Sequence, residues 1–233
     1  GLRRCVQSRQ YDADLMHPQA AVCFKISAQR TFLLFARAFS ARVFRNVSKK
    51  EGPAIKPHKK PLLDDPRMYS ADGYCIDQGA SRAIRYGKCS SAQNGCGWIA
   101  AYTLLRIAGN PYPPARVRAG LSPTLWMGGR MGTRVTALWR YLHRRGVTLI
   151  PTLRSSKAAE GPGGLAFYYT GKGFHFVAYA SAGRPRRYRF LNAVYGRDRL
   201  LCAPQQFRKQ FFKHGVGLFF RIAEPCPPVP WNL

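Results

Sequence analysis

SSAQNGCGWIAAYTLLRIAG, at residues 90–109, is an apolar run that begins with small and polar residues and closes on a glycine. Residues 97–108 are apolar nearly all round, which predicts a helix that is buried on most of its faces. Cys96 stands at the start of this helix between Gly95 and Gly97, where the backbone can turn tightly and a substrate can come close. A thiol at this place is near the positive end of the helix dipole and near free backbone N–H groups, and both favour the nucleophilic thiolate.

The residues that follow this run change from helical to strand periodicity. A second amphipathic helix is predicted over residues 133–145, and a short helix over residues 204–212. Segments rich in β-branched and aromatic residues predict strands at 147–153, 165–170, 174–180, 187–195 and 216–222. Helices that precede a mostly antiparallel sheet indicate an α+β fold, in which the helix that starts at Cys96 packs on the sheet.

A base for the thiol is predicted in the strand around His175, the only histidine inside an apolar strand segment. A hairpin that folds between Gly183 and Arg184 places Asn192 directly opposite His175, and cross-strand partners point to the same face. The amide oxygen of an asparagine can orient an imidazole there. A register slip of one residue would move Asn192 to the other face of the sheet.

At these residues the chain resembles the papain-like cysteine peptidases, and more closely their C39-like branch. The resemblance covers residues 90–196 and includes the order Gln93, Cys96, His175, Asn192. It implies that Cys96 is the nucleophile, His175 the general base, Asn192 the orienting residue and Gln93 an oxyanion donor. The implied activity is hydrolysis of peptide bonds. The branch usually carries Asp where this chain has Asn192, and relatives of this fold also perform acyl transfer.

The substrate cleft is expected beside the nucleophile. The sequence GGRMGT, at residues 128–133, is interpreted as a turn and helix entry near that cleft. Trp98 is interpreted as a core residue rather than as a ligand platform, although it adjoins the expected cleft. The candidate cleft residues are Gly95, Gly97, Trp98, Gly128 and Gly129.

The chain is strongly basic, with 38 Lys and Arg against 10 Asp and Glu and a net charge of +28. Residues 1–60 form a basic arm with a predicted amphipathic helix at 31–44 and a proline-rich linker, and a peptidase domain is predicted for residues 61–233. The arm helix fits an anionic membrane surface, a targeting segment or packing on the domain. The charge favours acidic peptide or protein substrates and non-specific contact with polyanions.

A basic protein that binds nucleic acid or anionic membrane, or a catalytically inactive relative, remains the competing interpretation. No RNA-recognition signature is present, so sequence-specific nucleic-acid binding is not expected. The 7 cysteines include no Cys-x-x-Cys pair, and no histidine stands at zinc-ligand spacing, so neither a metal nor another cofactor is expected. The odd number of cysteines favours a reducing compartment, and no apolar stretch reaches the roughly 18 residues of a membrane span.

Overall fold

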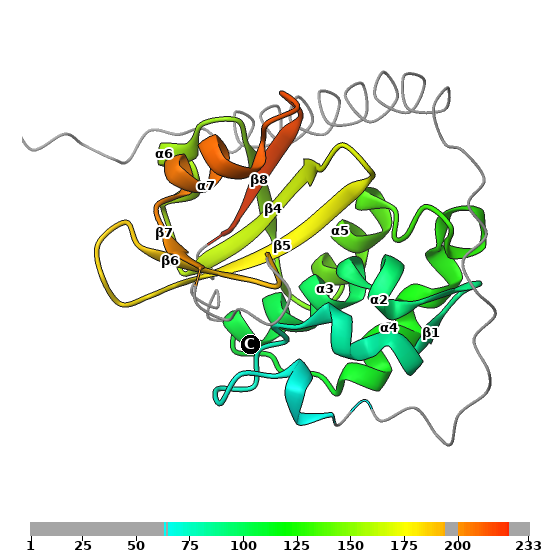
Figure 1. Ribbon diagram of the computed structural model, residues 1–233. Helices are drawn as coiled ribbons and strands as arrows, with labels where there is room; N and C mark the ends of the chain where they lie inside the picture. The colour runs from blue at the N-terminus through cyan, green and yellow to red at the C-terminus, as the bar shows by residue number, and fades with distance from the viewer. Residues whose placement is uncertain (1–62, 64, 194–199, 224–233) are drawn as a thin grey trace, which may run out of the picture. The chain divides into compact units, whose positions relative to one another are not determined.

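A six-stranded antiparallel sheet is the centre of the computed structural model, which describes residues 63, 65–193 and 200–223 (Figure 1). Its strand order is β3-β8-β4-β5-β6-β7, and every neighbouring pair runs antiparallel. The strands are β3 (Leu149–Thr152), β4 (Gly163–Tyr169), β5 (Phe174–Ser181), β6 (Tyr188–Leu191), β7 (Leu200–Cys202) and β8 (Gly217–Ile222). Each of the five predicted segments contains a strand, but β6 ends at Leu191 and so is shorter than the predicted 187–195. Strand β7 is an additional edge strand.

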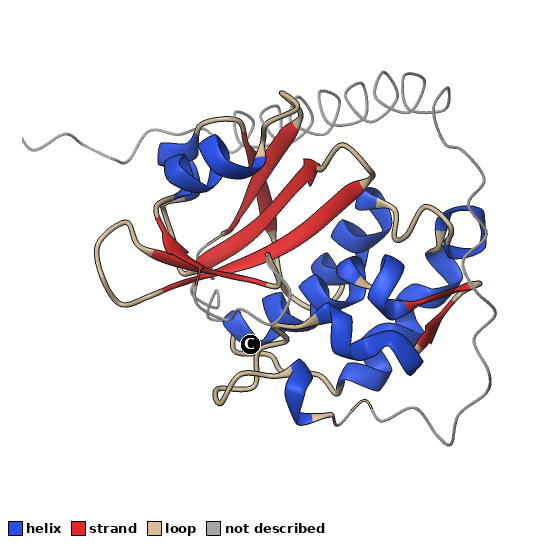
Figure 2. Ribbon diagram, viewed as in Figure 1, coloured by secondary structure: helices blue, strands red, loops and turns tan. Residues whose placement is uncertain are grey.

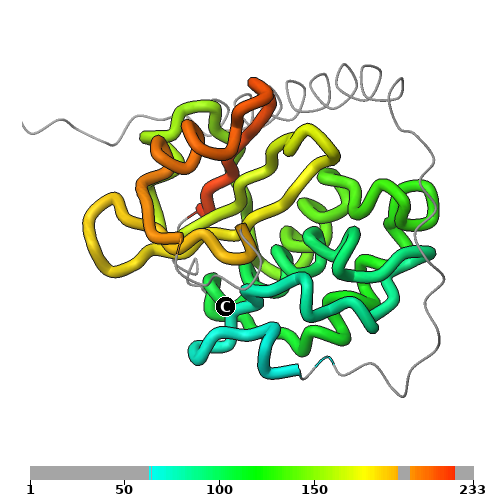
Figure 3. Tube along the Cα trace, viewed as in Figure 1, coloured from blue at the N-terminus to red at the C-terminus, as the bar shows by residue number. Residues whose placement is uncertain are grey.

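Helices precede the sheet along the chain, as Figures 2 and 3 show. They are α2 (Ser91–Asn94), α3 (Cys96–Ile107), α4 (Pro114–Leu121) and α5 (Val135–His143). Two more helices, α6 (Ser155–Ala158) and α7 (Pro204–Phe211), pack against each other. The predicted α+β class is confirmed, whereas the sequence did not predict α4.

Shorter elements connect these parts. Four 3₁₀ helices are present in the described chain: η1 (Pro66–Met68), η2 (Gln78–Ala83), η3 (Ser122–Thr124) and η4 (Trp126–Gly129). The short strands β1 (Arg85–Tyr86) and β2 (Cys89–Ser90) pair with each other and immediately precede α2 along the chain. This small hairpin brings the chain into the turn that begins α3.

Helix α3 is buried as its sequence predicts, because every residue from Cys96 to Leu105 is inaccessible or nearly so. It packs on α4, α5 and β5. Gly109 ends it with a φ of +75°, a left-handed conformation that glycine adopts without steric cost. Each large apolar side chain buried in this way stabilises the fold by roughly 1.5–3 kcal/mol.

The two faces of β5 serve different cores. Val177 and Tyr179 join Phe207 of α7 in a cluster of buried aromatic and aliphatic side chains. Since successive side chains of a strand point to opposite faces, Phe176 and Ala178 lie on the other face, on the side where α3 packs against β5. The strand that carries His175 is therefore held between α3 and α7.

The predicted arm helix at residues 31–44 and the predicted boundary near Pro61 lie outside the described residues. Within the described part of the chain, no helix combines the length and the apolar character that crossing a membrane requires.

Candidate functional site

Cys96 is the first residue of α3 and is 6% exposed. The short helix α2 ends at Asn94, and Gly95 is both the C-cap of α2 and the N-cap of α3. The backbone N–H groups of Phe176, Gly97 and Cys96 itself lie close to the Cys96 sulfur and favour its anion. The first N–H groups of a helix have no partner inside the helix, so they are free to point at the sulfur.

Burial dominates the ionisation of this thiol. It raises the Cys96 pKa from 9.0 to about 11, although the three N–H donors act in the opposite direction. The thiolate that the helix terminus predicts is therefore not the resting state at neutral pH. The physical reason is that desolvation of a nearly inaccessible sulfur outweighs the hydrogen bonds that stabilise its anion.

His175 lies at the start of β5, next to the residue whose N–H donates to the Cys96 sulfur. Its Nε2 is 2.9 Å from the backbone carbonyl oxygen of Asn192. A carbonyl oxygen only accepts, so Nε2–H is the donor and, in the neutral ring, Nδ1 carries the lone pair. Burial lowers the His175 pKa below its ordinary 6.5, against an opposing contribution from this hydrogen bond. The neutral imidazole is therefore a base with a defined tautomer.

The His175 ring also packs edge-on against Tyr168, its cross-strand partner in β4, with ring centroids 5.8 Å apart. Among the described residues, no hydrogen bond joins the ring to the Cys96 thiol. The two groups lie near the same end of β5, because the backbone of Phe176, the residue after His175, adjoins the sulfur.

The position of Asn192 differs from the predicted one. Ala178 pairs with Leu191, so the hairpin register lies two positions from the register that would set Asn192 opposite His175. A shift of two residues leaves each side chain on the same face of the sheet. However, β6 ends at Leu191, and Asn192 takes a left-handed φ of +63°. The group that orients the imidazole is consequently the Asn192 backbone carbonyl and not its side-chain amide.

The Asn192 side chain binds Gln78, a residue that the sequence analysis missed. Its Oδ1 accepts from the Gln78 backbone N–H at 3.0 Å, and its Nδ2 donates to the Gln78 Oε1 at 3.0 Å. Gln78 in turn donates from Nε2 to the carbonyl of Ala92 in α2 at 3.1 Å. Gln78 and Asn192 are 114 positions apart in the chain, so no local spacing signals their contact.

Gln93 has a structural role in the described contacts. Its Oε1 accepts from the Ser90 backbone N–H at 3.3 Å and from the Ser90 hydroxyl at 3.4 Å, which closes the first turn of α2. The side chain is otherwise exposed, and no described contact links it to Cys96. Its role as an oxyanion donor stays a prediction.

The cleft candidates divide into two groups. Trp98 is fully buried and donates from its indole nitrogen to the Ser91 hydroxyl at 3.1 Å, so it belongs to the core and not to a cleft. A Cβ at Gly95 would lie 2.8 Å from that nitrogen, and a Cβ at Gly97 would overlap Thr133, so packing alone requires both glycines.

Gly128 and Gly129 both have a positive φ and lie in η4. The Asn94 amide donates to the Gly129 carbonyl, which places this loop beside the junction of α2 and α3. Gly128 is exposed, whereas Gly129 is buried. The loop therefore borders the helix start that carries Cys96.

The described residues contain neither a disulfide nor a cluster suited to a metal ion. The described cysteines Cys75, Cys89, Cys96 and Cys202 are all free. In the described part of the chain, no group of three or more His, Cys, Asp or Glu side chains is arranged to hold a metal ion.

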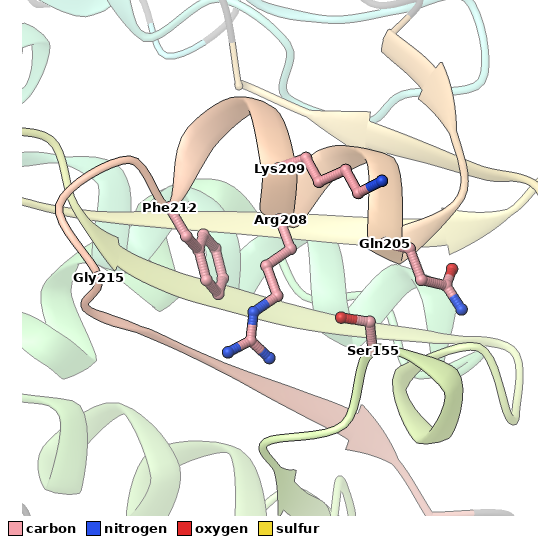
Figure 4. A pocket seen from close by; sticks show the side chains of 6 residues that line it. All are labelled: Ser155, Gln205, Arg208, Lys209, Phe212 and Gly215. Carbon is pink, nitrogen blue, oxygen red and sulfur yellow. The ribbon is translucent and has the colours of Figure 1, made fainter.

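A hollow of about 460 Å³ lies beside α7 (Figure 4). In Figure 4 the Arg208 guanidinium points between Phe212 and Ser155, and Lys209 points away from it. The hollow is lined by Ser155, Gln205, Arg208, Lys209, Phe212 and Gly215. Its basic and amide side chains are exposed, and none of its residues belongs to the group around Cys96.

Comparison with known proteins gives a structural match. Seven solved chains match this chain. One of them is the crystal structure of a double glycine motif protease from an AMS/PCAT transporter in complex with the leader peptide. This chain is similar to that protease. The TM-score is 0.38, with 15% sequence identity over 55% of this chain and 84% of that chain.

No protein-family model and no curated protein matches the chain.

Proposed function

We propose that this chain is a papain-like thiol hydrolase, a cysteine peptidase in which Cys96 is the nucleophile and His175 the general base. One observation carries the proposal: Phe176, whose backbone N–H favours the Cys96 anion, directly follows a histidine whose Nε2–H is held by the Asn192 carbonyl. A thiol, a neutral histidine with a defined tautomer and an orienting carbonyl are the groups that a thiol hydrolase requires, and their presence near one end of β5 supports the proposal.

The reaction begins from neutral partners. The Nδ1 lone pair of His175 takes the Cys96 proton as the sulfur attacks the carbonyl carbon of the peptide bond. The C–N bond then breaks, the amine half leaves with the proton from the imidazolium, and a thioester remains on Cys96. Water, deprotonated by His175, attacks the thioester, releases the carboxylic acid and restores the thiol.

Backbone N–H groups at the start of α3 supply stabilisation of negative charge. We assign to these groups, which favour the anionic sulfur, the additional role of donors to the substrate oxygen that gains charge beside it. Gln93 is the side chain that the family resemblance offers as a second donor. Replacing Gln93 by Ala tests this, because a donor to the oxyanion contributes roughly a hundredfold or more to kcat.

The experiment is cleavage of a mixed peptide library, read by mass spectrometry, with the full chain and with Cys96→Ala and His175→Ala. Cys89→Ala is a matched control, since Cys89 is a free, partly exposed cysteine that belongs to β2 and not to α3. Cleavage by the parent and by the Cys89 variant, and by neither site variant, supports the proposal. Equal cleavage by parent and Cys96→Ala overturns it.

Substrates of acidic character are part of the proposal, because the chain carries a net charge of +28. The same charge favours a second candidate function, binding of a polyanion such as nucleic acid or an anionic membrane surface. Backbone-type electrostatic binding weakens steeply with salt and does not depend on Cys96. Salt-sensitive binding of RNA that Cys96→Ala leaves unchanged, together with no peptide cleavage, favours the binding protein over the enzyme.

A further inference from the structure

The Gln78 side chain contacts both halves of the candidate site. It is 2% exposed and forms hydrogen bonds with Asn192 on one side and with Ala92 on the other. We propose that Gln78 is a positioning residue that sets the His175 imidazole and the start of α3 relative to each other. The inference rests on the proposed function for its catalytic meaning, but its geometry is independent of the substrate.

The contact with Asn192 controls the imidazole. Asn192 holds Gln78 through both ends of its amide group, at 3.0 Å each, and this pair of bonds fixes the Asn192 side chain. Asn192 has a φ of +63°, a left-handed conformation that few residues other than glycine and asparagine adopt. That turn aims the Asn192 carbonyl at the His175 Nε2. The Gln78 bonds hold the turn in place, so they also hold the ring.

The contact with Ala92 controls the nucleophile. Ala92 lies in α2, and α2 runs into the Gly95 cap from which α3 and Cys96 start. The bond from the Gln78 Nε2 to the Ala92 carbonyl therefore ties the entrance of α3 to the same side chain that holds Asn192. A single amide group bridges the element that carries the sulfur and the turn that orients the base.

Only an amide of this length satisfies both neighbours. The Asn192 Nδ2 needs an acceptor and the Ala92 carbonyl needs a donor, and a glutamine side chain offers one of each. A glutamate would set an oxygen against the Ala92 carbonyl, and a methionine would fill the space without either bond. Buried groups that lose their partners are costly, so the turn at Asn192 would rearrange to find others.

The first experiment measures the His175 tautomer by ¹⁵N NMR of the histidine-labelled full chain, with the His175 signals assigned by their loss in His175→Ala. The parent is expected to show neutral His175 protonated at Nε2. Gln78→Met is expected to give a mixture of the two tautomers, because the Asn192 side chain then keeps only its bond to the backbone N–H of residue 78 and holds the turn less firmly. Gln205→Met, on the exposed surface of α7, is the matched control and is expected to match the parent. An unchanged tautomer in Gln78→Met overturns the proposal.

A second variant covers the case in which Gln78→Met does not fold. Asn192→Gly keeps the left-handed turn and the carbonyl but removes both side-chain bonds to Gln78, so it is expected to give the same tautomer mixture. The double variant is expected to show less than the sum of the two single effects, because both single variants remove the bond between the Asn192 Nδ2 and the Gln78 Oε1. If Asn192→Gly keeps the parent tautomer, the positioning role is wrong.

Activity distinguishes this proposal from the proposed function. In an active parent, Gln78→Met is expected to lower kcat by roughly tenfold or more with KM unchanged, because only the geometry of the reacting groups is altered. A lower melting temperature with kcat and tautomer unchanged means that Gln78 is structural, and it overturns the proposal. An inactive parent in which Gln78→Met still shifts the tautomer removes the proposed function and supports the positioning of His175.

Discussion

The ionisation of Cys96 gives the sharpest prediction, because burial and hydrogen bonding act on it in opposite directions. A pKa of about 11, against 9.0 for an ordinary thiol, lowers the thiolate fraction at pH 7 by about a hundredfold. In free energy this is roughly 3 kcal/mol against ionisation of the isolated thiol. Iodoacetamide reacts with the thiolate, so alkylation of Cys96 is expected to be slow at neutral pH.

The assay is alkylation of the full chain from pH 5 to pH 10, read by mass spectrometry of the peptide that contains Cys96. The reference is the same peptide in the chain denatured with urea, where the thiol is solvated. The folded chain is expected to react about a hundredfold more slowly than the denatured one at pH 7, with a rate that rises tenfold per pH unit and shows no plateau below pH 9. Cys96→Ala confirms the assignment of the labelled peptide.

A different profile would refute this reasoning. A plateau of fast labelling between pH 5 and 8 that disappears in His175→Ala would show a thiolate–imidazolium pair at rest. The positive charge of the imidazolium would then stabilise the thiolate, and the balance between burial and hydrogen bonds deduced from the structure would be wrong. The proposed peptidase activity would survive that outcome, whereas the neutral resting pair would not.

Four further predictions follow from the packing and the charges. Gly97→Ala is expected to destabilise the fold by about 1–3 kcal/mol, because its Cβ would overlap Thr133; Gly173→Ala meets no atom and serves as the control in urea unfolding. Phe207→Ala is expected to cost about 3–5 kcal/mol in the same assay, since its ring is fully buried and stacks on Phe190 at 3.9 Å. The His175 pKa is lowered by burial, so its contribution to the free energy of unfolding is present above pH 6.5 and is lost as the pH falls through the folded-state value; His175→Gln is expected to flatten this part of the profile. Binding of RNA, measured by fluorescence anisotropy, is expected to weaken steeply between low and physiological salt, and a salt-independent affinity would contradict a charge-driven contact.

The elements that bear the site were predictable where one physical signal dominates. The run after Cys96 is apolar all round, and only burial accommodates such a helix, so α3 follows from its sequence. Helix α4 was missed because only Val117 and Leu121 of its residues are buried, which leaves a weak apolar stripe. Strand β7 has three residues and pairs only with β6, too short a segment for alternation to show.

The hairpin register depends on the turn and not on the strands. A fold between Gly183 and Arg184 would pair Ala182 with Pro185, and proline has no N–H to donate. The chain instead forms a wider turn in which Ala182 donates to the carbonyl of Arg187 at 3.0 Å, and Arg186 takes a φ of +57°. The predicted register of the β5–β6 hairpin was therefore wrong by two residues, although the predicted side-chain orientation relative to the two faces of the sheet was right.

The contact between Gln78 and Asn192 shows what a sequence does not reveal. The prediction placed Asn192 near His175 correctly as a neighbour but assigned the orienting role to its side chain. The Asn192 side chain is hydrogen-bonded to Gln78, which lies 114 positions away in the chain, and the Asn192 backbone carbonyl orients the imidazole. A backbone carbonyl carries no residue signature, so this kind of contact is visible only in the fold.

Neutral partners and a working nucleophile are compatible in this site because burial acts twice. It disfavours a lone charge on Cys96 or on His175, which is why the pKa of the thiol rises and that of the imidazole falls. In the proposed mechanism both charges form together, and the same low polarity then strengthens the attraction between them. A bound peptide would exclude the remaining water and offer its carbonyl carbon to the sulfur at that moment. Slow alkylation of the resting chain and cleavage of a bound peptide are therefore expected of the same molecule.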